Sequence, residues 1–141
     1  MPKASTFLWN ANMLLQVNCR GFAISKYMDT DISQYSYAPN IEAKTFFQPE
    51  QPYYAHHPGR FFYLHDVDTG KLYSAPYEPV RQLPERFSFS AGASDVKWAL
   101  SFNGIAVEVK VELAEEDIIE IWTVRLKNES GRPRNLSLIH I

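Results

Sequence analysis

The sequence predicts an all-β protein, an antiparallel β-sandwich of two packed sheets, and three observations lead to this fold class. Apolar and polar residues alternate over long stretches of the C-terminal third, as in strands with one buried face. The pair Asn103-Gly104 separates two of these stretches and is the strongest short signal for a hairpin turn. No stretch shows helical periodicity, and seven of the nine prolines lie between Pro39 and Pro84, which excludes long helices there.

Length, charge and cysteine content exclude several kinds of protein. With 141 residues and a net charge of −2, the chain has room for one domain and no excess of basic charge for nucleic acid or an anionic membrane. No apolar run approaches the roughly 20 residues of a membrane helix, and the N-terminus is a poor secretory signal. The single cysteine, Cys19, cannot form an internal disulfide and fits a reducing compartment. We therefore expect a soluble, cytoplasmic, single-domain chain.

The first ninety residues predict short strands. Leu15, Val17 and Cys19 alternate with polar residues before Gly21 interrupts, which predicts a strand pair or a bulged strand. The run Asp-Val-Asp-Thr-Gly at residues 66–70 lies between two apolar stretches and predicts a second hairpin. A short alternating strand is expected at residues 86–90.

The last third predicts a meander of three antiparallel strands. Asp95–Phe102 and Ile105–Leu113 alternate on either side of the Asn-Gly turn. A two-residue turn then pairs apolar side chains across the hairpin, namely Phe102 with Ile105, Leu100 with Val107, and Trp98 with Val109. Register, alternation and turn type therefore agree.

A third strand over residues 118–127 is expected after a short acidic turn. Pairing Leu113 with Ile118 sets Val109 opposite Trp122. Three side chains are then expected to stack on one buried face: Trp98, Val109 and Trp122.

Glu120 is the charged residue that this register places on the apolar face, opposite Val111. An unpaired carboxylate there is costly, so two alternatives remain: an edge position that reaches water, or an arginine from elsewhere in the chain. A catalytic acid is disfavoured because the pattern positions no second carboxylate near it.

The remaining chemical motifs are weak. Residues 66–70 resemble the start of a calcium loop, but Tyr77 stands where the twelfth-position glutamate belongs, which favours an Asp-rich turn. His56 and His57 are adjacent, so on an extended segment they point to opposite faces and cannot easily share a metal. We predict no metal site, no cofactor and no catalytic residue in this chain.

Two segments carry a resemblance to a known family. Residues 59–80 read GRFFYLHDVDTGKLYSAPYEPV and resemble the pattern R-[YF]-F-Y-[IL]-x-D-x-x-[TS]-G-x-x-W-S-P-x-x-x-P. Residues 117–134 read DIIEIWTVRLKNESGRPR and resemble D-x-x-E-[IV]-W-x-[LV]-x-[LV]-x-N-x-S-x-x-x-R. Both patterns belong to the N-terminal domain of glycoside hydrolase family 94, the cellobiose-phosphorylase-like enzymes formerly classed as glycosyltransferase family 36. Tyr73 in place of Trp and the inserted Ala75 are typical of a divergent branch, such as one nearer the C-terminal regions of cyclic β-glucan synthases.

The resemblance implies a supersandwich domain, similar to the galactose-mutarotase-like fold. In the family, the catalytic Asp and the phosphate-binding residues lie in a downstream helical (α/α)6 barrel. The resemblance therefore implies that residues 1–141 form one non-catalytic N-terminal domain, incomplete at its C-terminus and inactive alone. Residues 136–141 are either a further strand or adapter-derived sequence appended to a truncated gene fragment.

The resemblance also implies the partners. These are the barrel of the same polypeptide, an oligosaccharide or β-glucan with inorganic phosphate in the full enzyme, and a second subunit in a homodimer. Nucleic acid and membrane are not among them. A stand-alone carbohydrate-binding, lectin-like module is the alternative.

Five residues are predicted to bind substrate in the complete enzyme: Tyr53, Tyr54, His56, His57 and Arg60. They lie within residues 46–60, where prolines and aromatic residues are too dense for a flexible linker and alternate too little for a strand. In the resembling family, loops of this domain reach toward the active site of the partner subunit, which implies that these side chains face the barrel or the dimer partner. The rings would shield a sugar subsite, and Arg60 would offer paired donors to a sugar hydroxyl or phosphate. A loop that only caps the sandwich core is the alternative.

Overall fold

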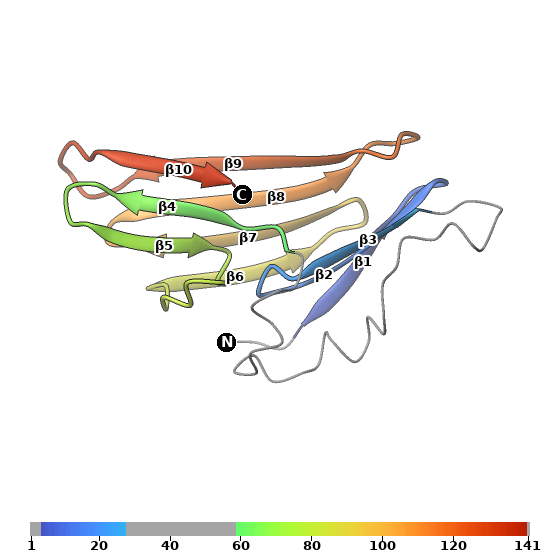
Figure 1. The fold of residues 1–141 in the computed structure, drawn as a ribbon, viewed down its shortest axis with the longest axis horizontal. Coiled ribbons are helices and arrows are strands. Elements are labelled where there is room, and N and C mark those ends of the chain that lie inside the picture. The colour runs from blue at the N-terminus through green and yellow to red at the C-terminus, as the bar shows by residue number, and fades with distance from the viewer. Residues whose placement is uncertain (1–3, 28–58, 141) are drawn as a thin grey trace.

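The computed structural model describes residues 4–27 and 59–140 and shows three antiparallel sheets (Figure 1). The strands are β1 (Ser5–Trp9), β2 (Met13–Asn18), β3 (Ala23–Tyr27), β4 (Phe62–Asp66), β5 (Lys71–Ala75), β6 (Arg86–Ala91), β7 (Asp95–Phe102), β8 (Ile105–Leu113), β9 (Glu120–Asn128) and β10 (Leu136–His140). The described residues include no helix, and hence none long and apolar enough to cross a membrane. The predicted all-β fold class is confirmed, although the described strands form three sheets where two were expected.

The largest sheet has the strand order β6-β7-β8-β9 and contains the predicted hairpin. β7 and β8 have the predicted bounds and register, ending with Phe102 opposite Ile105. Asn103 and Gly104 both have positive φ, 48° and 76°, as a type I′ turn requires. Because every second side chain of these strands is apolar, one face of the hairpin is buried from end to end: Val96, Trp98, Leu100, Phe102, Ile105, Val107, Val109 and Val111.

The predicted register between β8 and β9 is wrong by two residues. Leu113 lies opposite Glu120 instead of Ile118, and Trp122 lies opposite Val111 instead of Val109. The cause is a longer loop, residues 114–119, which is closed by a hydrogen bond of 2.9 Å from the Ala114 N–H to the Ile119 carbonyl. Because the shift is even, every side chain keeps its predicted face.

Side chains from the β1–β2 turn bind this loop and explain its length. The amide Nδ2 of Asn10 donates to the carbonyls of Ala114 and Asp117, at 2.8 and 2.9 Å. Asn12 Nδ2 donates to the carbonyl of Glu116 at 2.5 Å. These partners lie about a hundred residues away in the sequence, so a local pattern cannot predict them.

The small sheet β1-β2-β3 contains the strand pair predicted before and after Gly21. The Asn18 side chain accepts the N–H groups of Arg20 and Phe22, at 2.9 and 3.1 Å, and so shapes the turn between β2 and β3. Gly21 has a φ of 99°, and a Cβ at this position would lie 2.8 Å from the ring of Phe61. Glycine is therefore required here by the backbone and by the packing.

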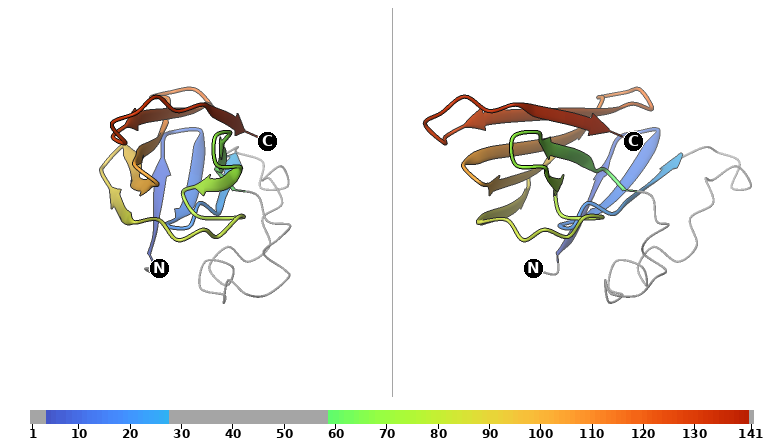
Figure 2. Two further views of the ribbon diagram at one scale, coloured as in Figure 1. Left: turned by 90° about the vertical axis from the view of Figure 1, so that its left-hand side faces the viewer. Right: turned by 60° about the vertical axis from the view of Figure 1, so that its left-hand side comes forward.

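The third sheet has the order β10-β4-β5. β4 and β5 form the hairpin predicted around residues 66–70, and β10 adds to β4 on its other edge. Figure 2 shows the strands of all three sheets arranged around one interior. Leu15, Leu64 and Trp98, one from each sheet, belong to the same buried apolar cluster. The Trp98 indole N–H donates to the Cys19 carbonyl at 2.9 Å, which ties β7 to the end of β2.

Trp122 was expected inside this core and lies at its border. It is half-buried, packs against the buried cluster, and meets the ring of Phe62 edge to face at 5.9 Å. Trp98 and Val109 are fully buried and paired as predicted, but the neighbour of Val109 on β9 is Val124. The expected stack of three therefore holds for two of its members.

Candidate functional site

Of the five predicted substrate-binding residues, Arg60 lies in the described part of the chain. Tyr53, Tyr54, His56 and His57 lie outside the described residues. Arg60 lies two residues before the start of β4, and its backbone N–H donates to the Gly21 carbonyl at 2.7 Å. This contact anchors the start of the β4 segment on the turn between β2 and β3.

The Arg60 side chain forms a compact polar cluster with three other residues, Ser25, Glu120 and Trp122, which we call the Arg60 cluster. The guanidinium Nε donates to Glu120 Oε2 at 2.5 Å, and Nη2 forms an ion pair with Oε1 of the same carboxylate. Nη2 also donates to Ser25 Oγ at 2.6 Å, while that hydroxyl donates to Glu120 Oε1. The Trp122 indole N–H donates to Glu120 Oε2 at 2.9 Å, and the guanidinium carbon lies 5.3 Å from the centre of the Trp122 ring. The paired donors of Arg60 are thus directed at a carboxylate of the same chain.

The environment of Glu120 keeps it ionised. Burial raises the pKa of its carboxyl, but hydrogen bonds from Arg60 and Ser25, the charge of Arg60 and the Trp122 N–H together outweigh it, and the pKa is lowered. The Arg60 and Glu120 side chains are 11% and 13% exposed. Of the two alternatives left open for Glu120, the arginine partner is confirmed. A carboxylate in this state is a poor proton donor at neutral pH.

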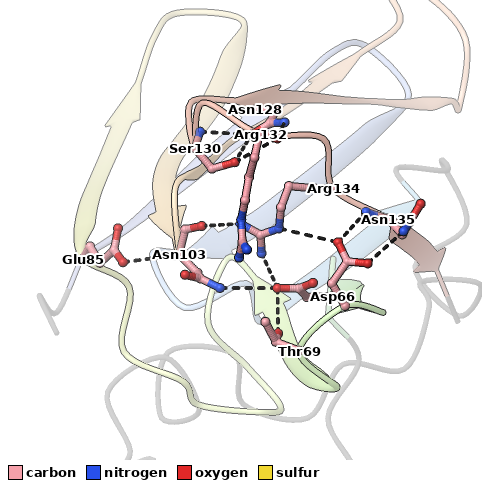
Figure 3. Close-up of polar contacts among 10 residues, drawn as sticks. Asp66, Thr69, Glu85, Asn103, Asn128, Ser130, Arg132, Arg134 and Asn135 are labelled. Atoms are coloured by element: carbon pink, nitrogen blue, oxygen red, sulfur yellow. Dashed lines mark hydrogen bonds and ion pairs between the residues drawn. The ribbon is translucent and has the colours of Figure 1, made fainter.

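A second polar cluster consists of Asp66, Thr69, Asn103 and Arg134, and we call it the Asp66 cluster (Figure 3). Arg134 Nη2 forms an ion pair with Asp66 Oδ2, and its Nη1 donates to the Asn103 carbonyl at 2.8 Å. Thr69 Oγ1 and Asn103 Nδ2 donate to the same carboxylate oxygen, at 2.7 and 3.3 Å. The Arg134 and Asp66 side chains are 2% and 1% exposed, so this pair is buried.

A neighbouring carboxylate, Asp68, accepts hydrogen bonds on the other side of this turn. It accepts the backbone N–H of Asn135 at 3.0 Å and the Asn135 side-chain amide at 2.7 Å. These two donors lower the pKa of Asp68. The pKa of Asp66 is also lowered, first by the Thr69 hydroxyl and, against the opposing effect of burial, by Arg134. Residues 66–70 therefore form an Asp-rich turn whose carboxylates bind Arg134 and Asn135. This is the alternative to a calcium loop that the sequence favoured.

A third buried acid, Glu78, was not found by sequence reasoning. It is 2% exposed and lies between Arg20, at 3.3 Å, and Arg81, at 2.9 Å. Arg20 also stacks over the ring of Tyr77, at 4.9 Å from its centre. This group fixes the end of β5 against the turn between β2 and β3. Arg20 is far from the other members in the sequence, and no alternation or motif spacing marked the group.

The two ion pairs did have a signal in the sequence. Arg60 and Asp66 lie in the first motif quoted for the resemblance, and Glu120 and Arg134 lie in the second. The structure pairs the charges of one motif with the charges of the other. Among the described residues, no three His, Cys, Asp or Glu side chains converge as metal ligands would.

The described surface includes two hollows of several hundred cubic ångströms. One, of about 500 Å³, lies where the start of β5, the connection to β6 and the turn between β7 and β8 meet. The other, of about 570 Å³, lies on the solvent face of the sheet β6-β7-β8-β9.

Comparison with known proteins assigns the whole described region to one type of domain. Residues 4–141 match the family model described as "Glycosyl hydrolase 94, supersandwich domain". The chain is 56% identical over 138 residues to a cellobionic acid phosphorylase of Neurospora crassa, which covers 98% of this chain and 17% of the relative. A solabiose phosphorylase of Paenibacillus borealis is 35% identical over 79 residues, 56% of this chain and 10% of the relative.

A third relative is more distant. An N,N'-diacetylchitobiose phosphorylase of Vibrio furnissii is 27% identical over 103 residues, 72% of this chain and 13% of the relative. The chain thus spans less than a fifth of the length of the relatives it matches. The resemblance expected from the two motifs is confirmed.

Proposed function

This chain belongs to the glycosyl hydrolase 94 supersandwich domain family, and from that premise we propose that it is a non-catalytic N-terminal domain of a glycoside phosphorylase acting on β-glucosides or β-glucans. One observation carries the proposal. Two charged residues of the first motif, Arg60 and Asp66, form ion pairs with Glu120 and Arg134 of the second motif, within the domain. Together with the Ser25 hydroxyl, these pairs connect β3 and the segment of β4 to β9 and the stretch that follows it. Such an arrangement supports a structural role for these four residues, and neither paired carboxylate is free to protonate a glycosidic oxygen.

The names of the relatives support the wider activity. Each of the three relatives named above is a phosphorylase of a disaccharide-like substrate, and each is several times longer than this chain. In the proposal, a catalytic (α/α)6 barrel supplied by the same polypeptide binds the sugar and inorganic phosphate. Cys19 is buried, and as the single cysteine of the chain it cannot form an internal disulfide, which is consistent with a reducing, cytoplasmic location.

Substrate contacts and dimerisation are part of the same proposal. Tyr53, Tyr54, His56, His57 and Arg60 would lie at the surface that faces the barrel or a second subunit of a homodimer. For Arg60, the last residue of the segment 46–60, the contacts with Glu120 and Ser25 support a role in anchoring the chain at this point. A carbohydrate subsite formed by the tyrosine rings remains a proposal from sequence.

The experiment that tests the proposal compares this chain with the complete enzyme that contains it. Both are incubated with inorganic phosphate and cellobionic acid, cellobiose or N,N'-diacetylchitobiose, and release of sugar 1-phosphate is measured. We expect turnover by the complete enzyme and none by the 141-residue chain. Phosphate-dependent turnover by this chain alone would contradict the non-catalytic role, and absence of turnover by the complete enzyme on every β-glucoside tested would contradict the phosphorylase assignment.

A further inference from the structure

The hollow beside the Asp66 cluster has the size and the chemistry of a small-ligand site. Its volume of about 500 Å³ lies within the roughly 300–1,000 Å³ typical of ligand pockets. It lies between the start of β5, the β5–β6 connection and the β7–β8 turn. None of its polar lining residues takes part in the substrate contacts proposed above.

The polar lining is balanced in charge. Lys71 and Glu85 contribute one positive and one negative charge, and Gln82 and Asn103 contribute two neutral amides. Together they offer N–H donors and carbonyl or carboxylate acceptors around one space. A neutral ligand with several hydroxyl groups can both donate and accept along such a wall.

Apolar groups complete the lining. The stacked rings of Tyr73 and Phe102, with centroids 4.5 Å apart, form a buried wall. Leu72 and Leu83 are 42% and 73% exposed, which leaves two large apolar side chains open to a ligand. A sugar ring presents C–H groups on its faces and hydroxyl groups around its edge, so it matches a site that combines apolar walls with scattered polar groups.

One side of the hollow is held rigidly by the Asp66 cluster. The Asn103 N–H donates to Glu85 Oε1 at 3.0 Å, its side-chain amide donates to Asp66, and its carbonyl accepts from Arg134 (Figure 3). The side chains of Lys71 and Gln82, in contrast, make no hydrogen bond or ion pair within the part of the chain that the structure describes. The fixed groups need little ordering when a ligand binds, and the uncommitted donors on the other side are available to it. This combination is suited to ligand binding.

The second hollow lacks these properties. Its charged side chains already neutralise one another: Arg86 and Lys127 with Glu129, at 2.8 and 3.0 Å, and Arg125 with Glu108, at 3.5 Å. These pairs lie on exposed strands and need no further partner. The comparison therefore favours the hollow beside the Asp66 cluster.

We propose that this hollow, lined by Lys71, Tyr73, Gln82, Leu83, Glu85 and Asn103, is an accessory binding site for one or two units of a neutral β-linked sugar. The choice of a carbohydrate among polyhydroxylated ligands rests on the proposed function. The site is separate from the catalytic step and would hold an oligosaccharide on the surface of the domain.

The test is a titration of the chain, labelled with ¹⁵N, with cellobiose and cellotetraose up to about 20 mM, followed by backbone amide shifts. We expect shifts confined to residues around the hollow. Gln82→Ala and Leu83→Ala should each weaken binding about fivefold, the equivalent of one lost hydrogen bond or apolar contact. Lys127→Ala, in the second hollow, is the control and should leave binding within about twofold of the unchanged chain.

Two results would overturn the proposal: no shift at the highest sugar concentration, or shifts that both variants leave unchanged. Because Gln82 and Leu83 are exposed, neither substitution threatens folding. The same variants in the complete enzyme give a second measurement, retardation in gels containing soluble β-glucan. Absence of phosphorolysis in the unsubstituted enzyme would contradict the proposed function. If phosphorolysis is present but the variants are retarded as strongly as the unsubstituted enzyme, the accessory site alone is contradicted.

Discussion

The Arg60 cluster and the Asp66 cluster connect the same two stretches of the chain, residues 59–80 and 117–134, at different depths. The first lies at the border of the core, where its two charged side chains are 11% and 13% exposed. The second is enclosed, with exposures of 2% and 1%. Both use an arginine and a carboxylate with neutral donors around them. The difference between them is therefore one of solvent access.

Depth changes what each pair contributes. A buried pair must recover the cost of removing both charges from water, and a missing partner then leaves an isolated buried charge. In the Asp66 cluster, Asp66 Oδ1 and Arg134 Nε have no hydrogen-bond partner among the described residues. In the Arg60 cluster, both oxygens of Glu120 accept hydrogen bonds. Loss of one partner should therefore cost more stability in the deeper pair. The hydrogen-bonding groups of the shallower pair are more completely satisfied.

The largest effect is expected from Arg134→Met. The substitution leaves the Asp66 carboxylate buried without its cation, and breaking a buried pair in this way costs about 3–5 kcal/mol of unfolding free energy. Urea denaturation followed by tryptophan fluorescence measures the loss. Arg132→Met is the matched control, because Arg132 is exposed and only its backbone carbonyl is bound in this loop, by Asn128 and Ser130.

A second substitution distinguishes an isolated charge from lost packing. Adding Asp66→Asn to Arg134→Met removes the uncompensated charge and should recover part of the stability. A double variant less stable than Arg134→Met alone would show that the buried charge is not the cause.

Glu120→Gln should have a smaller effect. It removes the negative charge that holds Arg60 but keeps an oxygen acceptor, and hydrogen bonds to charged groups typically contribute about 1.5–3 kcal/mol. The same denaturation experiment applies. Glu129→Gln, which breaks exposed pairs with Arg86 and Lys127, should cost less than about 1 kcal/mol. Equal losses in the two variants would contradict the distinction by depth.

The pH dependence sharpens the same comparison. The folded-state pKa of Glu120 is lowered, so its pair contributes fully above the unfolded-state value, near 4.5, and the contribution is lost as the pH falls through the folded-state value. The stability gap between the unchanged chain and Glu120→Gln should therefore be constant from pH 7 to about pH 5 and shrink below about pH 4.5. A gap that widens on acidification would contradict the lowered pKa.

Local geometry in this fold could be predicted from the sequence, whereas geometry set by distant residues could not. The hairpin of β7 and β8 was predicted residue for residue, because a two-residue Asn-Gly turn permits one register and the alternation agrees with it. The register of β9 was missed by two residues, because a six-residue loop sets no register of its own. The contacts that set it come from Asn10 and Asn12, at the other end of the chain.

The same limit applies to the candidate site. That Glu120 needs either water or an arginine followed from its place on an apolar face, but nothing local decided between the two or identified Arg60, sixty residues away. Arg134 and Asp66 are separated by 68 residues, and their pairing depends on the β7–β8 turn lying between them. β1 was not predicted at all, because a five-residue strand is too short for its alternation to stand out.

The smallest effects are expected from the neutral hydroxyls, and they test depth with the charges left in place. Thr69→Ala removes a donor to the buried Asp66, and Ser25→Ala removes a donor to the less buried Glu120. A single hydrogen bond contributes about 0.5–1.5 kcal/mol net, and the cost is higher when the partner has no water to replace it. We therefore expect Thr69→Ala to reach the upper end of that range and Ser25→Ala the lower end, since Glu120 keeps donors from Arg60 and Trp122. The two losses are compared by urea denaturation at pH 7. A larger loss in Ser25→Ala would show that the completeness of hydrogen bonding, more than burial, decides what each cluster contributes.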